Sequence, residues 1–302
     1  MKSYQQIVKQ SRRQDRIFRV VGILCTALGL VTLAVLLTDL VVDGLTRIDW
    51  QFLTTFPSRH YDKAGILSAW VGSLLVILVM ALSAIPLGIA AGVYLEEYAS
   101  RNWFSELLEI NVANLAGVPS IIFGLMALGI FVYFFGFGTS VLTAGLTLGC
   151  LVLPIVIVAT REALRTIPTS IREASYGLGA SKWQTVWFHL LPYSLGGIAT
   201  GVIVALSRAL GETAPLITIG ALTFIAFLPD PPVTTTPPYL SFEWLASPFT
   251  VLPIQMFNWI SRPQVDFHVN AAAAGLVLIV LTLFLNSLAI VIRYRMRKKI
   301  KW

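Results

Sequence analysis

Long apolar segments alternate with shorter polar connections along this chain of 302 residues. Several stretches without a charged side chain exceed the roughly 18 residues that a membrane-spanning helix requires. The pattern predicts six transmembrane helices, at residues 17–42, 66–95, 111–135, 139–160, 193–228 and 270–292. The fifth segment is longer than one crossing needs and is interrupted by a proline. We therefore expect an all-α polytopic membrane protein.

The composition supports this fold class. Charged residues make up 12% of the chain and hydrophobic residues 56%, whereas a soluble domain carries about 25% charged residues. The net charge of +7 would also suit a nucleic-acid-binding protein. The basic residues, however, gather beside the ends of the apolar segments, so we expect a lipid membrane as the partner and no nucleic acid.

The distribution of Lys and Arg predicts the orientation. Basic residues are concentrated in residues 1–19, in 161–190 and in the last ten residues, with Arg101 on the same side. The opposite side holds only Arg47, Arg59, Lys63 and Arg262. Because cytoplasmic loops carry the excess of Lys and Arg, both termini are expected in the cytoplasm. The expected organisation is a cytoplasmic tail at 1–16, a transmembrane domain at 17–292 and a basic cytoplasmic tail at 293–302.

The chain lacks the sequence motifs of common catalytic and metal sites. It contains no GxxxxGK[ST] phosphate loop, no HExxH motif and no Cys/His cluster. Its three histidines, His60, His189 and His268, lie in different segments. We expect a non-catalytic chain without a metal or cofactor of its own. Active transport by such a chain would draw on an ion gradient or on a separate ATP-hydrolysing subunit.

The connection at 161–192 is polar and helical in pattern. Helix starts are indicated by Pro168 and by the capping-box patterns Ser170-x-x-Glu173 and Ser181-x-x-Gln184, and a helix break by Gly177 and Gly179. This predicts two short helices joined at a glycine corner on the cytoplasmic membrane surface. Such an element could dock in a groove of another protein. A single amphipathic surface helix is the alternative.

The second long connection, 229–269, is rich in proline and is expected outside the cell. Its apolar stretch PFTVLPIQMFNWI (248–260) is too short to span a membrane. It is either an interfacial or re-entrant helix or a rigid loop packed on the outer surface.

Pairs of glycines at GxxxG spacing occur in three of the predicted membrane helices. They are Gly88 and Gly92, Gly145 and Gly149, and Gly197 and Gly201. Small residues at this spacing let helix backbones approach closely, so we expect tight packing at these positions.

Arg208 and Glu212 stand four residues apart within the fifth apolar segment. An Arg near the bilayer centre costs about 2.5–3.5 kcal/mol on insertion scales, and a base placed before an acid is the weaker i, i+4 order. Two hypotheses remain: a structural ion pair, within the chain or with a partner, or part of an anion pathway. In the pathway, the Arg208 guanidinium would present its N–H donors to the oxygens of an anion.

Other polar residues near the apolar segments are weaker candidates. Pro119 would free a backbone carbonyl and Ser120 would offer a hydroxyl to an anion, although helix packing explains both residues equally well. Glu96 and Glu97, at the cytoplasmic end of the second segment, are expected to be solvated or interface charges.

The 161–192 connection resembles the EAA loop of ATP-binding-cassette importer permeases, whose pattern is E-A-A-x3-G-x9-I-x-L-P. The matching positions are Glu173, Ala174, Gly179, Leu191 and Pro192, whereas Ser175 and His189 depart from the pattern. The resemblance implies that this loop forms a coupling helix seated in a groove of a cytoplasmic ATPase subunit.

Further segments resemble the A-type permeases of phosphate-specific transport (Pst) systems. They are residues 86–99, 114–125, 207–216 and 248–259, and the last span, which contains Asn286. It implies a type I importer (MetI-like) fold in a prokaryotic inner or plasma membrane. The implied partners are a C-type permease, two copies of an ATPase that binds ATP and Mg, and an external phosphate-binding protein. A permease for another oxyanion such as molybdate or sulfate, or a secondary transporter or channel, remains an alternative.

Overall fold

The computed structural model describes residues 4–100, 102–231, 233, 239 and 241–299. Within these ranges the chain is helical and contains no β-strand. Lys2, Arg101 and Lys301, which contributed to the predicted orientation, lie outside the described residues, as do parts of the proline-rich connection.

Five helices of the described chain are long and apolar enough to cross a membrane. Their main helices are α1 (Tyr4–Leu45), α3 (Leu67–Val93), α6 (Val141–Arg165), α9 (Leu191–Gly211) and α12 (Asp266–Lys299). A π-helical turn, η1 (Tyr94–Tyr98), extends α3. A bent pair of helices provides a sixth crossing if it is counted as one span. The all-α polytopic fold class is thus confirmed.

The segment predicted at 111–135 is not one straight helix. It consists of α4 (Trp103–Leu115) and α5 (Ser120–Ala127), the latter continued by the π-helical η2 (Leu128–Phe134), with a bend of 107° between them. Pro119 lacks a backbone N–H and disfavours the helical conformation of the residue before it. The apolar pattern runs through the bend without interruption, so hydropathy alone could not locate it.

The predicted fifth segment also ends earlier than expected. Helix α9 stops at Gly211, because Glu212 adopts an extended conformation with ψ of 123°. A separate short helix, α10 (Ala214–Thr218), begins with Pro215 in its first turn. Glu212 therefore lies just outside the membrane-length helix that carries Arg208.

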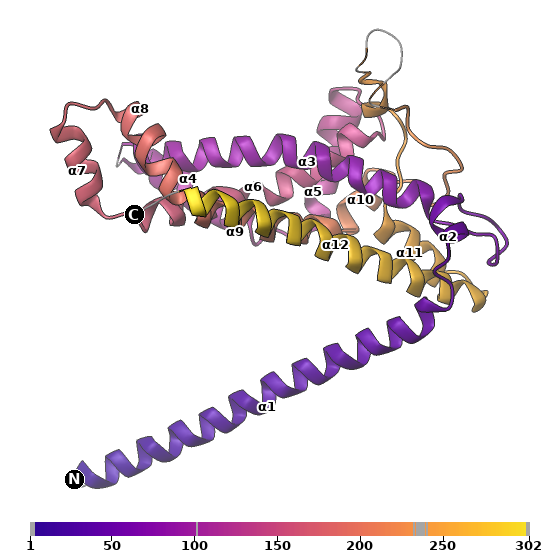
Figure 1. Cartoon of the computed structure of the whole chain (residues 1–302), viewed down its shortest axis with the longest axis horizontal. Helices are drawn as coiled ribbons and strands as arrows, with labels where there is room; N and C mark the ends of the chain where they lie inside the picture. Colours follow the sequence, from indigo (N-terminus) through magenta and orange to yellow (C-terminus); the bar gives the residue numbers. More distant parts are fainter. Residues whose placement is uncertain (1–3, 101, 232, 234–238, 240, 300–302) are drawn as a thin grey trace.

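Helices α3, α6 and α9 form the core, and the three glycine pairs lie at their contacts (Figure 1). A Cβ atom on Gly88 would lie 2.7 Å from Val156 of α6, and one on Gly92 would lie 2.6 Å from Thr160. Gly145 and Gly149 of α6 face Val79 and Ser83 of α3, and Gly197 and Gly201 of α9 face Ala163 and Ala159 of α6. The predicted close packing is confirmed, and the structure identifies α6 as the helix shared by both contacts.

The proline-rich connection ends in a buried short helix, α11 (Leu252–Ile260). Leu252, Ile254 and Trp259 are fully buried, and Trp259 lies beside Phe52 of α2 (Trp50–Thr54) with ring centroids 6.0 Å apart. The segment therefore folds into the core at the end of the molecule that carries α2 (Figure 1). A loop packed on the outer surface does not describe it.

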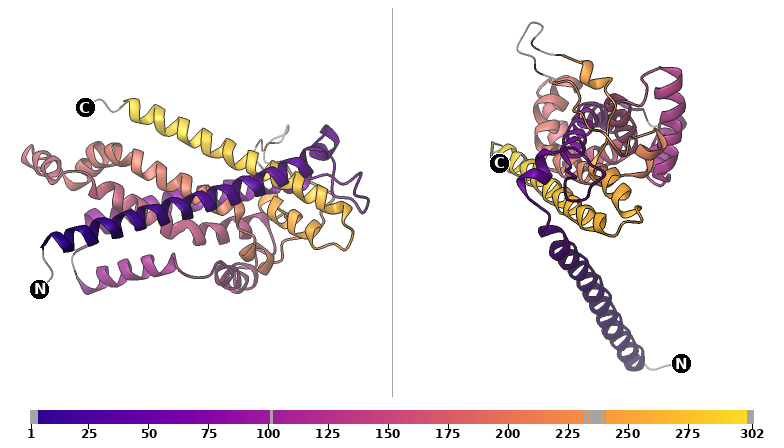
Figure 2. Two further views of the ribbon diagram at one scale, coloured as in Figure 1. Left: turned by 90° about the horizontal axis from the view of Figure 1, so that it is seen from below. Right: turned by 90° about the vertical axis from the view of Figure 1, so that its right-hand side faces the viewer.

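Helix α1 departs from the rest of the molecule (Figure 2). No residue in its most apolar stretch of 18 residues is buried. Its contact with α12 lies near its C-terminal end, where a Cβ on Gly44 would meet Ala272 and Leu276 at 2.8–2.9 Å. Most of α1 thus offers its side chains to lipid or to another chain.

Candidate functional site

The connection at 161–192 forms the predicted pair of short helices. Helix α7 (Thr169–Gly177) is followed by a corner and by α8 (Lys182–Thr185), which continues through the π-helical η3 (Val186–Leu190) into α9. At the corner, Gly179 has φ of +85°, a conformation that glycine adopts without steric cost. The pair projects from the end of the helix bundle (Figure 1).

One of the two predicted capping boxes is present. The Ser181 hydroxyl accepts a hydrogen bond from the Gln184 N–H at 3.3 Å, and the Gln184 side chain accepts one from the Ser181 N–H at 2.8 Å. The capping box predicted at Ser170 is wrong. Helix α7 begins one residue after Pro168, which occupies the capping position without a side-chain hydrogen bond.

The residues predicted to contact an ATPase are divided between the corner and its base. Glu173, Ala174 and Gly179 are exposed on α7 and the corner, whereas Leu191 and Pro192 are half-buried where α9 begins. Leu178, beside Gly179, is 90% exposed. The corner therefore presents an exposed apolar side chain, which suits a groove in another protein.

Ser175, which departs from the EAA pattern, has a structural role of its own. Its buried hydroxyl lies 2.8 Å from the hydroxyl of Thr185, which is also buried. The hydrogen bond joins α7 to α8 and satisfies two polar groups that would otherwise lose water. Where the EAA pattern has Ala, this chain therefore has Ser175, whose hydroxyl is paired with that of Thr185 on α8.

Several ion pairs surround the base of this segment. Glu96 of η1 accepts hydrogen bonds from Arg165 Nε at 3.0 Å, and Glu109 of α4 lies 2.7 Å from Arg161 Nη2. Glu97, the next residue of η1, lies 2.6 Å from Arg172 Nη2 of α7. The Glu97 side chain is only 6% exposed. Of the two expectations for Glu97, a solvated or an interface charge, the contact between η1 and α7 fits the second and not the first. The sequence shows that Glu96 and Glu97 are acidic and that the 161–192 connection is basic, but it does not show which arginine each carboxylate pairs with.

Arg208 and Glu212 form an ion pair, with Arg208 Nε 3.3 Å from Glu212 Oε1. The two residues keep the i, i+4 spacing, and Glu212 is the capping residue at the C-terminal end of α9, so the contact lies at the very end of the helix. The Arg208 side chain is 39% exposed and that of Glu212 is 19% exposed. Among the described residues, no hydrogen bond engages the Arg208 Nη1 and Nη2 atoms, so they remain available to another group.

The residue before Arg208 links α9 to α12. The Ser207 hydroxyl, which has one proton to donate, lies 2.9 Å from Asn286 Oδ1 and 2.8 Å from the Ile203 carbonyl oxygen. This contact ties α12 to the last turns of α9 immediately before the ion pair. Both residues lie in stretches that resemble the Pst permeases, but the sequence does not show that they contact each other.

Pro119 and Ser120 lie at the bend between α4 and α5. Pro119 is exposed and Ser120, the first residue of α5, is half-buried. Helix α5 packs against α10, where a Cβ on Gly124 would lie 2.6 Å from the Pro215 carbonyl oxygen. The fold therefore brings the element that starts with Ser120 beside the one that follows Glu212. No contact between Ser120 and Arg208 joins these sites among the described residues.

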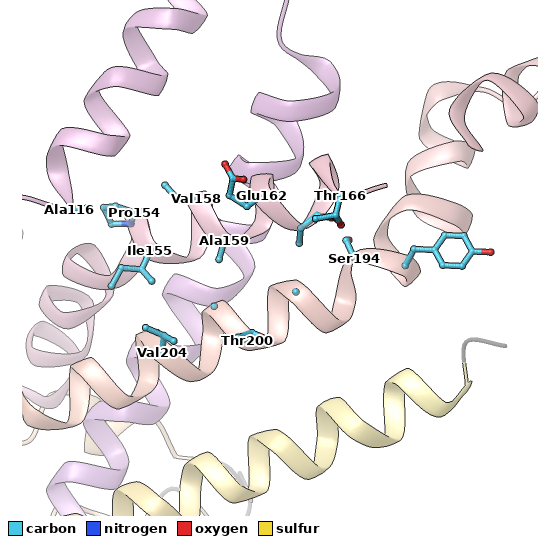
Figure 3. A pocket seen from close by; sticks show the side chains of 14 residues that line it. Ala116, Pro154, Ile155, Val158, Ala159, Glu162, Thr166, Ser194, Thr200 and Val204 are labelled. Carbon is cyan, nitrogen blue, oxygen red and sulfur yellow. The ribbon is translucent and has the colours of Figure 1, made fainter. Parts of the chain in front are cut away.

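A groove of about 700 Å³ runs along α6 and α9 (Figure 3). It extends from Ala116, at the end of α4, to Tyr193, near the start of α9. Ala159 and Val204 line its apolar part, and Glu162, Thr166 and Thr200 add polar groups. The groove thus occupies the length of α9 that separates the projecting corner from the Arg208 end.

Comparison with known proteins identifies close similarity to membrane transport subunits. Residues 84–301 match the family described as binding-protein-dependent transport system inner membrane component. The chain is 33% identical to a phosphate transport system permease protein PstA of Yersinia pestis over 93% of this chain and 90% of that protein. It is 31% identical to a PstA of Mycobacterium leprae over 88% and 84%.

Two further proteins extend the similarity. A probable ABC transporter permease protein of Bacillus subtilis, YqgI, is 31% identical over 85% of this chain and 88% of that protein. Among solved structures, a chain of the MetNI methionine ABC transporter in an inward-facing conformation has a TM-score of 0.55 and 18% identity. That match covers 76% of this chain and 95% of the other.

Proposed function

Because this chain belongs to the family of binding-protein-dependent transport system inner membrane components, we propose that it is the A-type permease subunit of an ATP-driven importer of inorganic phosphate. Its fold is that of a MetI-type ABC importer permease, and PstA proteins are among its relatives. The observation that carries the proposal is the exposed corner formed by α7, Gly179 and α8. Its projection from the bundle suits docking to a separate ATPase.

In this proposal the transport complex contains further subunits. A second, C-type permease completes the pathway, two cytoplasmic subunits bind ATP and Mg, and an external protein delivers phosphate. The α7–α8 corner lies on the cytoplasmic side with both termini. Arg161, Arg165, Arg172 and Lys182 support this orientation, because basic residues accumulate on the cytoplasmic face. Both ends of the described chain also point toward the α7–α8 end of the molecule (Figure 1).

Arg208 is the proposed phosphate contact of this subunit. A guanidinium presents a planar set of N–H donors that suits phosphate oxygens, and Arg208 has an exposed side chain at the end of α9. Glu212, at 3.3 Å, offsets part of the positive charge. A transport pathway must bind its ion weakly enough for release. Pro119 and Ser120 are proposed to line the same pathway from the bend before α5.

Uptake of labelled phosphate by cells carrying Arg208→Gln tests the pathway role, with assembly of the complex measured by co-purification. We expect assembled complex and strongly reduced uptake. Arg59→Gln, which removes the same charge from an exposed loop residue, is the matched control and should transport normally. Normal uptake by Arg208→Gln would remove Arg208 from the pathway.

The substrate is tested on the complete complex reconstituted in vesicles. ATP hydrolysis should rise with phosphate-loaded binding protein, and should not rise with sulfate or molybdate. Stimulation by one of those oxyanions instead would refute phosphate as the substrate. Transport by this chain alone in vesicles without ATP would refute the importer assignment.

A further inference from the structure

We propose that Glu97 and Arg172 form a latch that transmits displacement of the coupling segment to helix α3. This inference rests on the proposed function, in which a cytoplasmic ATPase moves the α7–α8 corner. The Glu97–Arg172 latch consists of these two side chains and joins η1, the end of α3, to α7. Both are positioning residues, because neither is placed on the pathway or at the corner's exposed tip.

The geometry of the latch uses the whole guanidinium group. Arg172 Nη2 donates to Glu97 Oε1 at 2.6 Å, and Nε donates to the same oxygen at 3.1 Å. Two further hydrogen bonds reach the Leu164 carbonyl at 3.1 Å and the Ile167 carbonyl at 2.9 Å. Leu164 lies in the last turn of α6 and Ile167 in the link that follows it. Arg172 therefore ties α7 both to the end of α6 and to α3.

Burial makes this contact specific. The side chains of Glu97 and Arg172 are 6% and 19% exposed, so water replaces neither partner easily. Removing one partner of a buried ion pair leaves an uncompensated charge. Planar, paired N–H donors also set the orientation of the carboxylate more strictly than a lysine ammonium would. The latch thus holds α7 in one orientation relative to α3.

Within the part of the chain that the structure describes, α7 makes no other ion pair or side-chain hydrogen bond to α3 or η1. A three-residue link, Thr166–Pro168, joins it to α6, and the Ser175–Thr185 hydrogen bond joins it to α8. Leu164, Ile167, Val186 and Leu190 form a small buried cluster, against which Val93 of α3 and Ile171 of α7 pack. Among the described residues, the latch is the ion pair that connects α7 to α3. From there the glycine contacts of α3 carry a displacement into α6.

Glu96 provides a matched control within the same turn. Its carboxylate pairs with Arg165 and Arg161, both of α6. Its ion-pair partners lie on α6, so they hold α3 to α6 and leave α7 out. Neutralising Glu96 therefore removes a similar charge, from an adjacent position, without opening the latch.

The test uses the complete complex reconstituted in vesicles with phosphate-loaded binding protein, and compares Glu97→Gln, Arg172→Lys and Glu96→Gln. The measured quantity is labelled phosphate transported per ATP hydrolysed. For Glu97→Gln and Arg172→Lys we expect this ratio to fall about 5- to 150-fold, the usual range for coupling between distant sites, while ATP hydrolysis continues. Glu96→Gln should keep the wild-type ratio.

A purely structural role has a different outcome. It would lower uptake and hydrolysis together, in proportion to the assembled complex, and would leave their ratio unchanged. An unchanged ratio in both latch variants overturns the proposal, as does failure of both variants to assemble. If Glu97→Gln alone fails to assemble, Arg172→Lys, which keeps the positive charge, decides. Absence of phosphate-dependent hydrolysis in the wild-type complex would instead refute the proposed function.

Discussion

Replacing Gly88 with Ala should weaken the contact between α3 and α6. The added Cβ would lie 2.7 Å from both Cβ and Cγ1 of Val156, whereas carbon atoms pack best at about 3.5–4.0 Å. The two helices would have to separate by roughly 1 Å, and overpacking of this kind costs about 1–3 kcal/mol. Val156 is fully buried and belongs to the main core cluster, so its side chain has little room to move aside.

Gly29→Ala on α1 is the matched control, because a Cβ there meets nothing within 4 Å. Both changes replace glycine inside an apolar helix, so the gain in helix propensity, about 1 kcal/mol, cancels in their difference. The assay is denaturant unfolding of the purified chain in detergent micelles, followed by circular dichroism. Gly88→Ala should be less stable than Gly29→Ala by about 1–3 kcal/mol. Equal free energies of unfolding would refute the packing argument.

Two further changes test the corner and the opposite end of the molecule. Gly179→Ala should reduce ATP-dependent uptake, because the left-handed conformation at φ of +85° costs a non-glycine residue roughly 1–2 kcal/mol. The control Gly177→Ala, in helix α7 and also with open space around an added Cβ, should have little effect on uptake. Equal uptake by the two variants would contradict this reasoning. Asn270→Ala should lower the free energy of unfolding by about 1–3 kcal/mol, because Asn270 is fully buried and its Oδ1 accepts a hydrogen bond from Arg47 Nε at 3.1 Å. The same denaturant titration measures it, and an unchanged midpoint would contradict the assigned role.

The sequence predicted most of the helical framework because long apolar runs depend only on local composition. It also predicted the corner at Gly179, since glycine and the Ser181 capping box act within a few residues. The bend at Pro119 was missed because the apolar pattern is continuous across it. Proline alone does not distinguish a bend of 107° from the tolerated prolines Pro86 and Pro154, which lie inside α3 and α6.

The pairing of charges could not be read from the sequence. Glu97 and Arg172 are 75 residues apart, and their contact depends on how η1, α6 and α7 meet. The spacing of Arg208 and Glu212, by contrast, does indicate their i, i+4 contact, although it does not show that α9 ends at Gly211. For Glu97 and Arg172 the residue types were evident from the sequence, and tertiary structure decided that they pair.

The length of α1 sets how far the chain reaches from the membrane. Its 42 residues extend about 63 Å at 1.5 Å per residue, about twice the roughly 30 Å thickness of the hydrocarbon core. Even at a tilt of about 40°, the upper end of the usual range, more than about 20 Å of helix remains in water or among the lipid headgroups. Arg12, Arg13 and Arg16 lie in this excess part and are exposed. In the proposed orientation, with the N-terminus on the cytoplasmic side, α1 would place these cations against the anionic cytoplasmic leaflet.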